Sequence, residues 1–230
     1  MFKNSFAIAL AISLVTVTSH LRAEEIWKIT SIEWQPYVGS EFTDKGSSAH
    51  ILKELLKKRG ITLALEFLPW KRSQEQAKTQ EYVGYFPAWP SEVSEGFTAS
   101  DPIDWSVVGL MQRTDHKITY ESVDKLFKEH KVGIVSTYVY PKAIMDAIAK
   151  YPDHVDKSKD EIVLLRKLSK KRYDVAITDP NVMMYLAKKE GITNVEPNKE
   201  IIEKTALVIA FRNDAENQSR IQLMKDLTAK

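Results

Sequence analysis

Residues 171–186, with the sequence KRYDVAITDPNVMMYL, decide the expected fold. The run YDVAIT is apolar and β-branched, as is typical of a short buried strand. Asp179 ends this run, and Pro180 follows at the position of a first helical residue, where its fixed φ and missing amide hydrogen are favourable. Apolar residues then recur at helical spacing as far as Gly191, which predicts the end of a helix. The stretch therefore predicts a strand that passes directly into a helix.

Asp179 has two interpretations. It lies at the carboxyl end of the predicted strand, and in an open α/β sheet ligands bind outside that end of the strands. Aspartate is also a favoured N-cap residue, and a cap uses the same side-chain oxygens as a ligand contact. The spacing of residues leaves both interpretations open.

The first 23 residues have the pattern of a secretory signal peptide. Lys3 supplies a short basic start, residues 6–17 form an apolar stretch, and the small residue Ala23 precedes Glu24. This apolar stretch is too short to be a membrane anchor. We therefore expect an exported chain that begins at residue 24 and is soluble in a bacterial periplasm.

Charge and cysteine content restrict the partners of the exported chain. Loss of Lys3 and Arg22 lowers the number of basic residues from 33 to 31, which equals the 31 acidic residues. A neutral chain without clustered positive charge argues against a nucleic-acid partner. The sequence has no cysteine, so disulfides, thiolate metal sites and a lipid-bearing cysteine are excluded. We expect a monomer that has no cofactor and is held together by its hydrophobic core.

Strand and helix patterns alternate along the exported chain. Strands are expected at 25–32, 61–67, 82–86, 106–111, 131–135, 173–178 and 204–211, and helices at 47–59, 71–79, 122–129, 141–150, 160–171, 180–190 and 215–227. Ser47 is expected to cap the first helix, and residues 91–104 are expected to form a loop. The order predicts an α/β protein with a parallel sheet, in two halves that are joined by apolar strands near 106–112 and 205–211.

Six short motifs occur in a defined order: WQPY at 34–37, LPWKR at 68–72, FTASDP at 97–102, KVGIV at 131–135, YDVAITD at 173–179 and LVIAFR at 207–212. In this order the chain resembles the periplasmic solute-binding proteins of ABC importers, in the polar-amino-acid-binding group with the type II fold. The resemblance implies two lobes with two crossing hinge strands. Lobe one would contain residues 24–111 plus 206–230, and lobe two residues 112–205. A small-molecule ligand would bind in the cleft and pass to an ABC permease.

The same resemblance implies a set of ligand contacts. The acid that takes a ligand's ammonium group corresponds to Asp179, and the loop that receives a ligand's polar end corresponds to Ser136, Thr137 and Tyr138. Four aromatic residues lie in predicted loops at one edge of the sheet, where stacking on a flat group or a cation is expected: Trp34, Tyr37, Trp70 and Trp89. The alternative is that some of these rings pack between the lobes.

One departure from the family pattern bears on the ligand. Amino-acid binders of this group hold an α-carboxylate with a Thr and an Arg, and the corresponding positions here are Ala88 and Val93. A desolvated carboxylate without its cationic partner costs about 3–5 kcal/mol, which argues against a conventional amino acid. Arg72, at the start of a helix below the cleft, is either a substitute or a solvated first-turn arginine. With Asp179 opposite the aromatic rings, the pattern favours a small amine or cationic solute.

Two other functions remain open from the sequence. A binding protein that reports to a membrane sensor would use the same closing motion as one that feeds a permease. Some relatives of this fold are lyases, and Glu33 or Asp179 in a dry cleft would then act as a general acid on a prephenate-like substrate. The sequence has no Gly-x-Ser-x-Gly elbow, Gly-rich phosphate loop or metal-spaced histidine pair, so we expect no enzyme.

Overall fold

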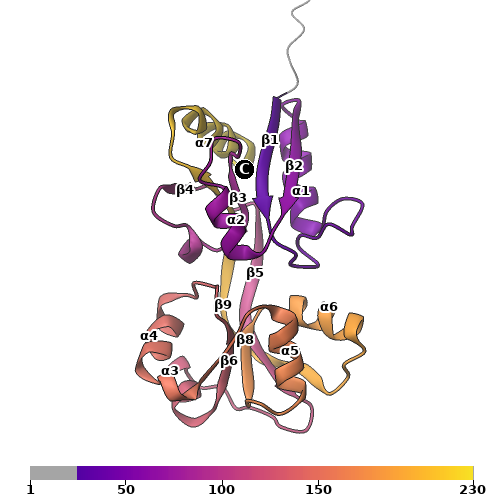
Figure 1. The fold of residues 1–230 in the computed structure, drawn as a ribbon, viewed down its shortest axis with the longest axis vertical. Helices are drawn as coiled ribbons and strands as arrows, with labels where there is room; N and C mark the ends of the chain where they lie inside the picture. Colours follow the sequence, from indigo (N-terminus) through magenta and orange to yellow (C-terminus); the bar gives the residue numbers. More distant parts are fainter. Residues whose placement is uncertain (1–24, 230) are drawn as a thin grey trace, which may run out of the picture.

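The computed structural model describes residues 25–229, which form two groups of helices and strands joined by two long strands (Figure 1). The expected signal peptide, residues 1–23, lies outside the described residues. None of the helices within residues 25–229 is long and apolar enough to cross a membrane.

The first group, at the top of Figure 1, contains the N-terminal strands and the C-terminal helix. In its sheet, β1 pairs in parallel with β2 on one side and with β3 on the other. Its elements are β1 (Glu25–Ser31), α1 (Ser47–Lys57), β2 (Ile61–Phe67), α2 (Trp70–Gln76), β3 (Gly84–Ala88), the 3-10 helix η1 (Pro90–Glu92), β4 (Phe97–Ala99) and α7 (Ala215–Thr228).

The second group, at the bottom of Figure 1, has its own parallel strands, with β6 between β7 and β8. Its elements are α3 (Val123–Glu129), β6 (Val132–Val135), α4 (Lys142–Lys150), the 3-10 helix η2 (Pro152–His154), β7 (Val155–Ser158), α5 (Glu161–Ser169), β8 (Val175–Thr178) and α6 (Pro180–Glu190).

Two antiparallel strands, β5 (Asp104–Arg113) and β9 (Val195–Arg212), run through both groups. They complete one continuous sheet with the order β2-β1-β3-β9-β5-β8-β6-β7, and β4 pairs with β9 beside it. The two-lobed α/β fold with two crossing strands is thus confirmed. The residue boundaries 24–111 plus 206–230 and 112–205 remain a prediction. Below, lobe one means the elements around β1 to β3, and lobe two those around β6 to β8.

Several expected elements differ from the structure. The sheet is mixed, because β5 and β9 run antiparallel to their neighbours. The short strands β4 and β7 fall in stretches that are rich in polar residues, where their patterns are too brief to detect. The N-cap of α1 is Gly46, and the expected cap Ser47 is the first helical residue. The helix after β8 begins at Pro180 and ends at Glu190, and Gly191, with a left-handed φ of 67°, is its C-cap, as expected.

Candidate functional site: a pocket between the lobes

A narrow pocket lies where the crossing strands leave lobe one. In this closed arrangement its free space is about 20 Å³, which is room for about one water molecule. Most of its wall comes from lobe one and β9, and Tyr138 closes it from the loop after β6 in lobe two. The residues that line it are Ile32, Trp34, Trp70, Pro87, Trp89, Glu92, Tyr138 and Leu207. Apart from Glu92 and the phenol of Tyr138, the described lining offers aromatic and aliphatic surface, which suits the apolar part of a small ligand.

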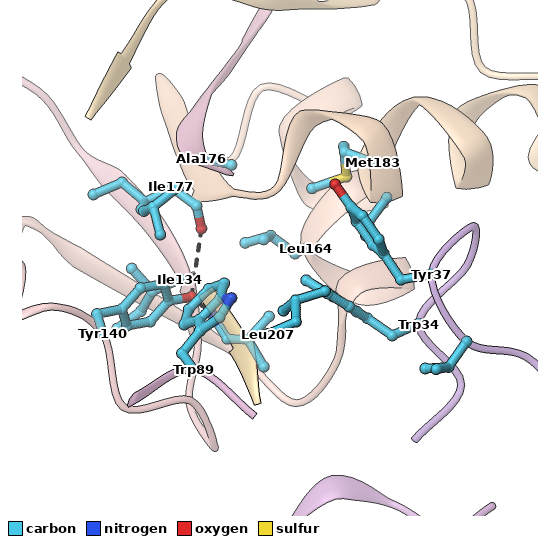
Figure 2. Packing of buried hydrophobic residues seen from close by; sticks show 14 of the residues in the cluster. Trp34, Tyr37, Trp89, Ile134, Tyr140, Leu164, Ala176, Ile177, Met183 and Leu207 are labelled. Atoms are coloured by element: carbon cyan, nitrogen blue, oxygen red, sulfur yellow. Dashed lines mark hydrogen bonds between the residues drawn. The ribbon is translucent and has the colours of Figure 1, made fainter. Parts of the chain in front are cut away.

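A chain of aromatic rings crosses from lobe one to lobe two at this pocket. Tyr37 stacks on Trp34 with centroids 4.8 Å apart, and Trp34 meets Trp89 edge-on at 6.1 Å. Trp89 then contacts Tyr138 at 5.8 Å and Tyr140 at 5.9 Å, both from lobe two. Figure 2 shows Tyr37 beside Trp34, and Trp89 beside Tyr140. The rings therefore pack the two lobes together and also form the pocket wall.

Hydrogen bonds hold two of the indole rings in fixed orientations. Trp70 Nε1 donates to Glu92 at 2.8 Å, and Trp89 Nε1 donates to Ser106 Oγ on β5 at 2.9 Å. Trp34 Nε1 is buried with no hydrogen-bond partner of normal geometry among the described residues, and it faces the carboxyl group of Glu161. These bonds fix the orientation of the two rings, which lowers the entropy cost of ordering the wall around a ligand. A ligand larger than a water molecule still needs the lobes to move apart to enter.

Glu92 places a carboxyl group in the wall of the pocket. The side chain is 6% exposed and accepts hydrogen bonds from Trp70 Nε1 and from the backbone N–H of Trp89. Its own carbonyl accepts from the Tyr85 hydroxyl at 2.7 Å. Burial raises the pKa of Glu92 to about 7, although the Trp89 and Trp70 donors and the Val139 amide oppose the shift. The group is therefore poised between its neutral and charged forms near neutral pH.

Glu161 is a second buried carboxyl group, at the start of α5 in lobe two. Its two oxygens accept from the hydroxyl of Thr178 at 2.9 and 2.8 Å. Burial raises the pKa of Glu161 to about 8, and the negative charge of Asp179 adds to the rise. The donors from Thr178, Trp34 and Tyr138 act in the opposite direction. At neutral pH Glu161 is mostly protonated, so it presents a polar group without a full charge.

Asp179 caps α6 and also bridges the lobes. Its Oδ1 accepts from the backbone N–H of Asn181 at 2.7 Å and of Val182 at 3.4 Å. Its Oδ2 accepts from the Tyr37 hydroxyl at 2.9 Å and from the Val107 N–H on β5 at 3.1 Å. The N-cap interpretation is confirmed, and the carboxyl group is fully buried with four donors. In this conformation the Tyr37 hydroxyl occupies the side of Asp179 that faces lobe one.

Contacts at two edges of the pocket region hold the lobes together. Ser91 Oγ, beside Glu92, donates to the carbonyl of Val139 in lobe two at 2.6 Å. On the other edge, Glu41 accepts from Lys189 Nζ on α6 at 2.8 Å and from the hydroxyl of Tyr185. Phe42 meets Tyr185 edge-on at 5.8 Å. The structure is therefore a closed arrangement of the two lobes.

The expected site residues divide into two sets. Trp34, Trp70, Trp89 and Tyr138 line the pocket together, and Tyr37 packs behind Trp34. The others do not line the pocket: Arg72, Ser136, Thr137 and Asp179. Arg72 lies exposed on α2, and the Ser136 amide is already bonded to the Ser158 carbonyl. Whether each of these nine residues contacts a ligand remains a prediction.

The sequence did not predict the roles of two carboxyl groups in this region, Glu92 and Glu161. Glu92 lies in the segment expected to be a loop, and Glu161 follows the N-cap Asp160, so that it resembles an ordinary first-turn acid. Glu92 precedes Val93, the position where the resemblance leads us to expect an arginine, and Ala88 is buried in β3. The one feature of the sequence that points to Glu92 is the short Trp-Pro-Ser-Glu turn, because such a turn permits the Glu92 side chain to accept from the Trp89 amide.

No group of three or more potential metal ligands comes together within residues 25–229.

Comparisons with known proteins show similarity at the level of the fold. No protein-family model matches the sequence, and no curated protein matches it significantly. Among solved structures, a histidine kinase sensor domain with similarity to periplasmic binding proteins is 16% identical, with a TM-score of 0.72 and coverage of 90% of both chains. An ancestral arginine-binding protein bound to arginine is 14% identical, with a TM-score of 0.70 and coverage of 88% of this chain and 90% of that one.

A third structure is an ancestral amino-acid-binding protein described as a precursor of cyclohexadienyl dehydratase. It is 15% identical, with a TM-score of 0.66 and coverage of 88% of this chain and 87% of that one. This chain has the two-lobed fold of periplasmic binding proteins.

Proposed function

We propose that the protein is an exported solute-binding protein that closes its two lobes on a small ligand bearing an amine or another cationic group. The observation that carries this proposal is the pocket between the lobes. It combines three tryptophan rings with a buried carboxyl group, and none of the described residues that line it is basic. Tryptophan faces and carboxylates both attract cations, whereas a ligand carboxylate would meet no counter-charge there.

The comparisons support a binding function through the fold. Arginine, the ligand named for one of the similar structures, carries a cationic side chain. We propose that the ligand of this chain shares that positive charge but has no α-carboxylate, since Ala88 and Val93 stand where amino-acid binders have the carboxylate clamp. Delivery of the ligand to an ABC permease and reporting to a membrane sensor both use closure of the two lobes. The similarity to a histidine kinase sensor domain supports the sensor role as an alternative to delivery.

A second candidate function is that of a periplasmic lyase. Two observations favour it: one structure of the same fold is a precursor of a dehydratase, and Glu92 and Glu161 both hold a proton near neutral pH, as a general acid must. An acidic substrate would still need a cationic partner in the pocket. Proton NMR of the protein incubated with prephenate or arogenate tests this candidate, which predicts loss of substrate signals that Glu92→Gln or Glu161→Gln abolishes.

A thermal-shift panel tests the binding function. We expect putrescine or choline to raise the melting temperature of the purified protein without its signal peptide, because a ligand that binds only the folded state stabilises it by mass action. Glutamate, succinate and other small acids are expected to leave the melting temperature unchanged. A rise with acids and none with amines would contradict the proposal.

Two tryptophan variants, one inside the pocket and one outside it, test whether the shift reports on this pocket. Trp34→Leu removes a ring from the pocket wall and should remove most of the shift, measured against the variant's own ligand-free melting temperature. Trp105→Leu changes an indole on β5 that is 48% exposed and outside the pocket, and it should retain the shift. Equal loss in both variants would show that the shift does not report on this pocket.

A further inference from the structure

Glu92 differs from every other described residue of the pocket wall. It is the one acidic side chain among them, and its two oxygens are held separately, one by Trp70 Nε1 and the other by the Trp89 amide. The carboxyl group is therefore fixed at the N–H edge of the Trp70 ring and at the backbone of Trp89, in a wall that also contains the Trp34 and Trp89 rings. A carboxyl group and indole rings in one wall suit a cation with apolar substituents.

The carboxyl group of Glu92 lacks a counter-charge. No lysine or arginine of the described chain forms an ion pair with it, and its environment acts on it through burial and neutral donors. A charged carboxylate buried in this way is costly unless it is paired. Neutral donors reduce that cost only in part, so Glu92 is partly protonated near pH 7, and a cation in the pocket would hold it in the charged form.

We propose that Glu92 is the specificity-determining residue of this pocket, and that its partner is a substituted ammonium group, of the quaternary kind, on a ligand that has no carboxylate beside the cation. This inference rests on the proposed function and narrows it. The ammonium group supplies the missing charge, its alkyl substituents cover the tryptophan rings, and an adjacent carboxylate is repelled by Glu92.

The same residue connects the ligand to lobe closure. Ser91, next to Glu92, donates to the Val139 carbonyl of lobe two, and the Val139 amide lies close enough to Glu92 to lower its pKa. Ser91 and Glu92 of lobe one thus interact with the carbonyl and the amide of the same residue, Val139, in lobe two. A Glu92 carboxylate kept charged by a cation accepts the Val139 amide more strongly than a neutral carboxyl group does, so that binding favours the closed state.

Binding of a permanent cation should also release a proton. The titratable groups that face Glu92 are Tyr85 on β3 and Tyr138 and Tyr140 after β6, and burial raises the pKa of all three phenols. These phenols stay neutral below pH 9, which leaves Glu92, with a pKa of about 7, to lose its proton when the cation enters. Glu161, with a pKa of about 8, lies behind Trp34 and Tyr138 and is a second possible source of the proton, so Glu161→Gln, which should still release the proton of Glu92, is the control variant.

Isothermal titration calorimetry with three matched probes tests the inference. Choline is a permanent cation, 3,3-dimethylbutan-1-ol is its neutral carbon analogue, and glycine betaine carries the same cation beside a carboxylate. We expect choline to bind the wild-type protein at least about tenfold more tightly than either of the others. Glu92→Gln should weaken choline binding about tenfold and leave the neutral alcohol within about twofold, because only the charge is removed. The exposed neighbour variant Glu95→Gln should behave like the wild type.

The pH profile of the wild-type protein gives a second measurement that does not depend on the folding of Glu92→Gln. Choline does not titrate, so its affinity should fall as the pH drops below about 7 and level off about tenfold lower, where Glu92 is protonated and resembles Glu92→Gln. Proton release should be detected in buffers of different ionisation enthalpy. A flat profile between pH 5.5 and 8.5, equal binding of choline and betaine, or unchanged choline binding by Glu92→Gln would each overturn the inference. If putrescine binds while these results are found, the proposed function stands. If no cation binds, both fail.

Discussion

At the scale of single residues, Asp179 shows how one side chain can serve as both a cap and a link. Its two oxygens accept four hydrogen bonds, and these come from α6, from β5 and from the loop that holds Tyr37. Loss of the carboxyl group would leave these donors without their acceptor, and the Val182 amide and the Tyr37 hydroxyl are buried, so the carboxyl group is important for the stability of the protein in the absence of a ligand.

Replacement of Asp179 tests this structural role. We expect Asp179→Ala to lower the free energy of unfolding of the ligand-free protein by about 2–4 kcal/mol, because a cap and the partners of Tyr37 and Val107 are lost together. The control is Asp160→Ala, which removes an exposed cap that accepts from the Val163 amide and lies 3.8 Å from the exposed Lys159 Nζ, and it should cost about 1 kcal/mol. Urea titration measures both. A ligand-free Asp179→Ala protein as stable as Asp160→Ala, with lost amine binding, would instead make Asp179 a ligand contact.

Glu161 predicts a pH dependence of stability. Its pKa in the folded protein is about 8, above its ordinary value of 4.5, so the folded state binds the proton more tightly than the unfolded state. The resulting stability is fully present below pH 4.5 and is lost as the pH rises toward 8. Between pH 5 and pH 8 we expect a loss on the order of a few kcal/mol, to which Glu92 also contributes.

Urea titrations at pH 5 and pH 8 measure this loss. Glu161→Gln should retain only the smaller part that Glu92 contributes, because the amide does not titrate. Glu203→Gln, at an exposed position on β9, should lose as much as the wild type. If Glu161→Gln and the wild type lose the same stability, Glu161 is ionised in the folded protein throughout this range.

Residue-scale prediction from the sequence succeeded where a side chain's place followed from its position along a strand. Trp34, Trp70 and Trp89 were expected at one edge of the sheet because each follows or precedes a strand pattern, and the structure brings them into one pocket. Glu92 and Glu161 could not be found in this way. Their importance comes from burial, which depends on how the two lobes meet, and a local pattern does not contain that information.

At the scale of elements, the two strands that join the lobes show what the hydrophobic pattern of the sequence predicts correctly and what it misses. The apolar cores of β5 and β9 were expected, but β9 extends from Val195 through a polar stretch to Arg212. Pairing with β5 along its length imposes strand structure on residues whose composition does not favour it. The pairing register between β5 and β9 shifts around Gly109, where β5 begins to pair with β8 of lobe two. Such irregularities bend strands locally, which is compatible with a hinge.

Gly84, the first residue of β3, provides a prediction at this scale. A Cβ atom at this position would lie 2.0 Å from the carbonyl oxygen of Ala210 on β9, and a backbone oxygen cannot rotate away. We expect Gly84→Ala to destabilise the protein by about 3 kcal/mol or more, through separation of β3 from β9. Gly60→Ala meets no atom within 4 Å and should cost only about 1–2 kcal/mol for its φ of 70°. Urea titration compares them, and similar losses would mean that β3 and β9 can move apart freely.

At the scale of the whole molecule, the closed arrangement depends on a small number of polar contacts between the lobes. Tyr37 makes two of them, since its hydroxyl donates to Asp179 and accepts from Asn181 Nδ2 at 3.0 Å. The contacts of Glu41 with lobe two are exposed and contribute little in water. The buried Tyr37 contacts are therefore the ones expected to set the balance between open and closed states.

Tyr37→Phe tests this balance because it removes the hydroxyl and keeps the ring that stacks on Trp34. Without a ligand, the variant should populate the open state more and give a larger radius of gyration in small-angle X-ray scattering. Its affinity for the amine selected by the thermal-shift panel should fall about tenfold, because ligand binding must now drive closure without the two hydrogen bonds. At saturating ligand both proteins should have the same radius.

Tyr82→Phe is the matched control, since its hydroxyl donates to Glu66 within lobe one. It should leave both the radius of gyration and the affinity unchanged. If Tyr37→Phe lowers the melting temperature and the affinity while its ligand-free radius stays equal to that of the wild type, then the hydroxyl stabilises the folded protein as a whole. The closed state would in that case be held by the aromatic contacts between Trp89 and Tyr138, and a ligand would have to enter between rings that are already packed.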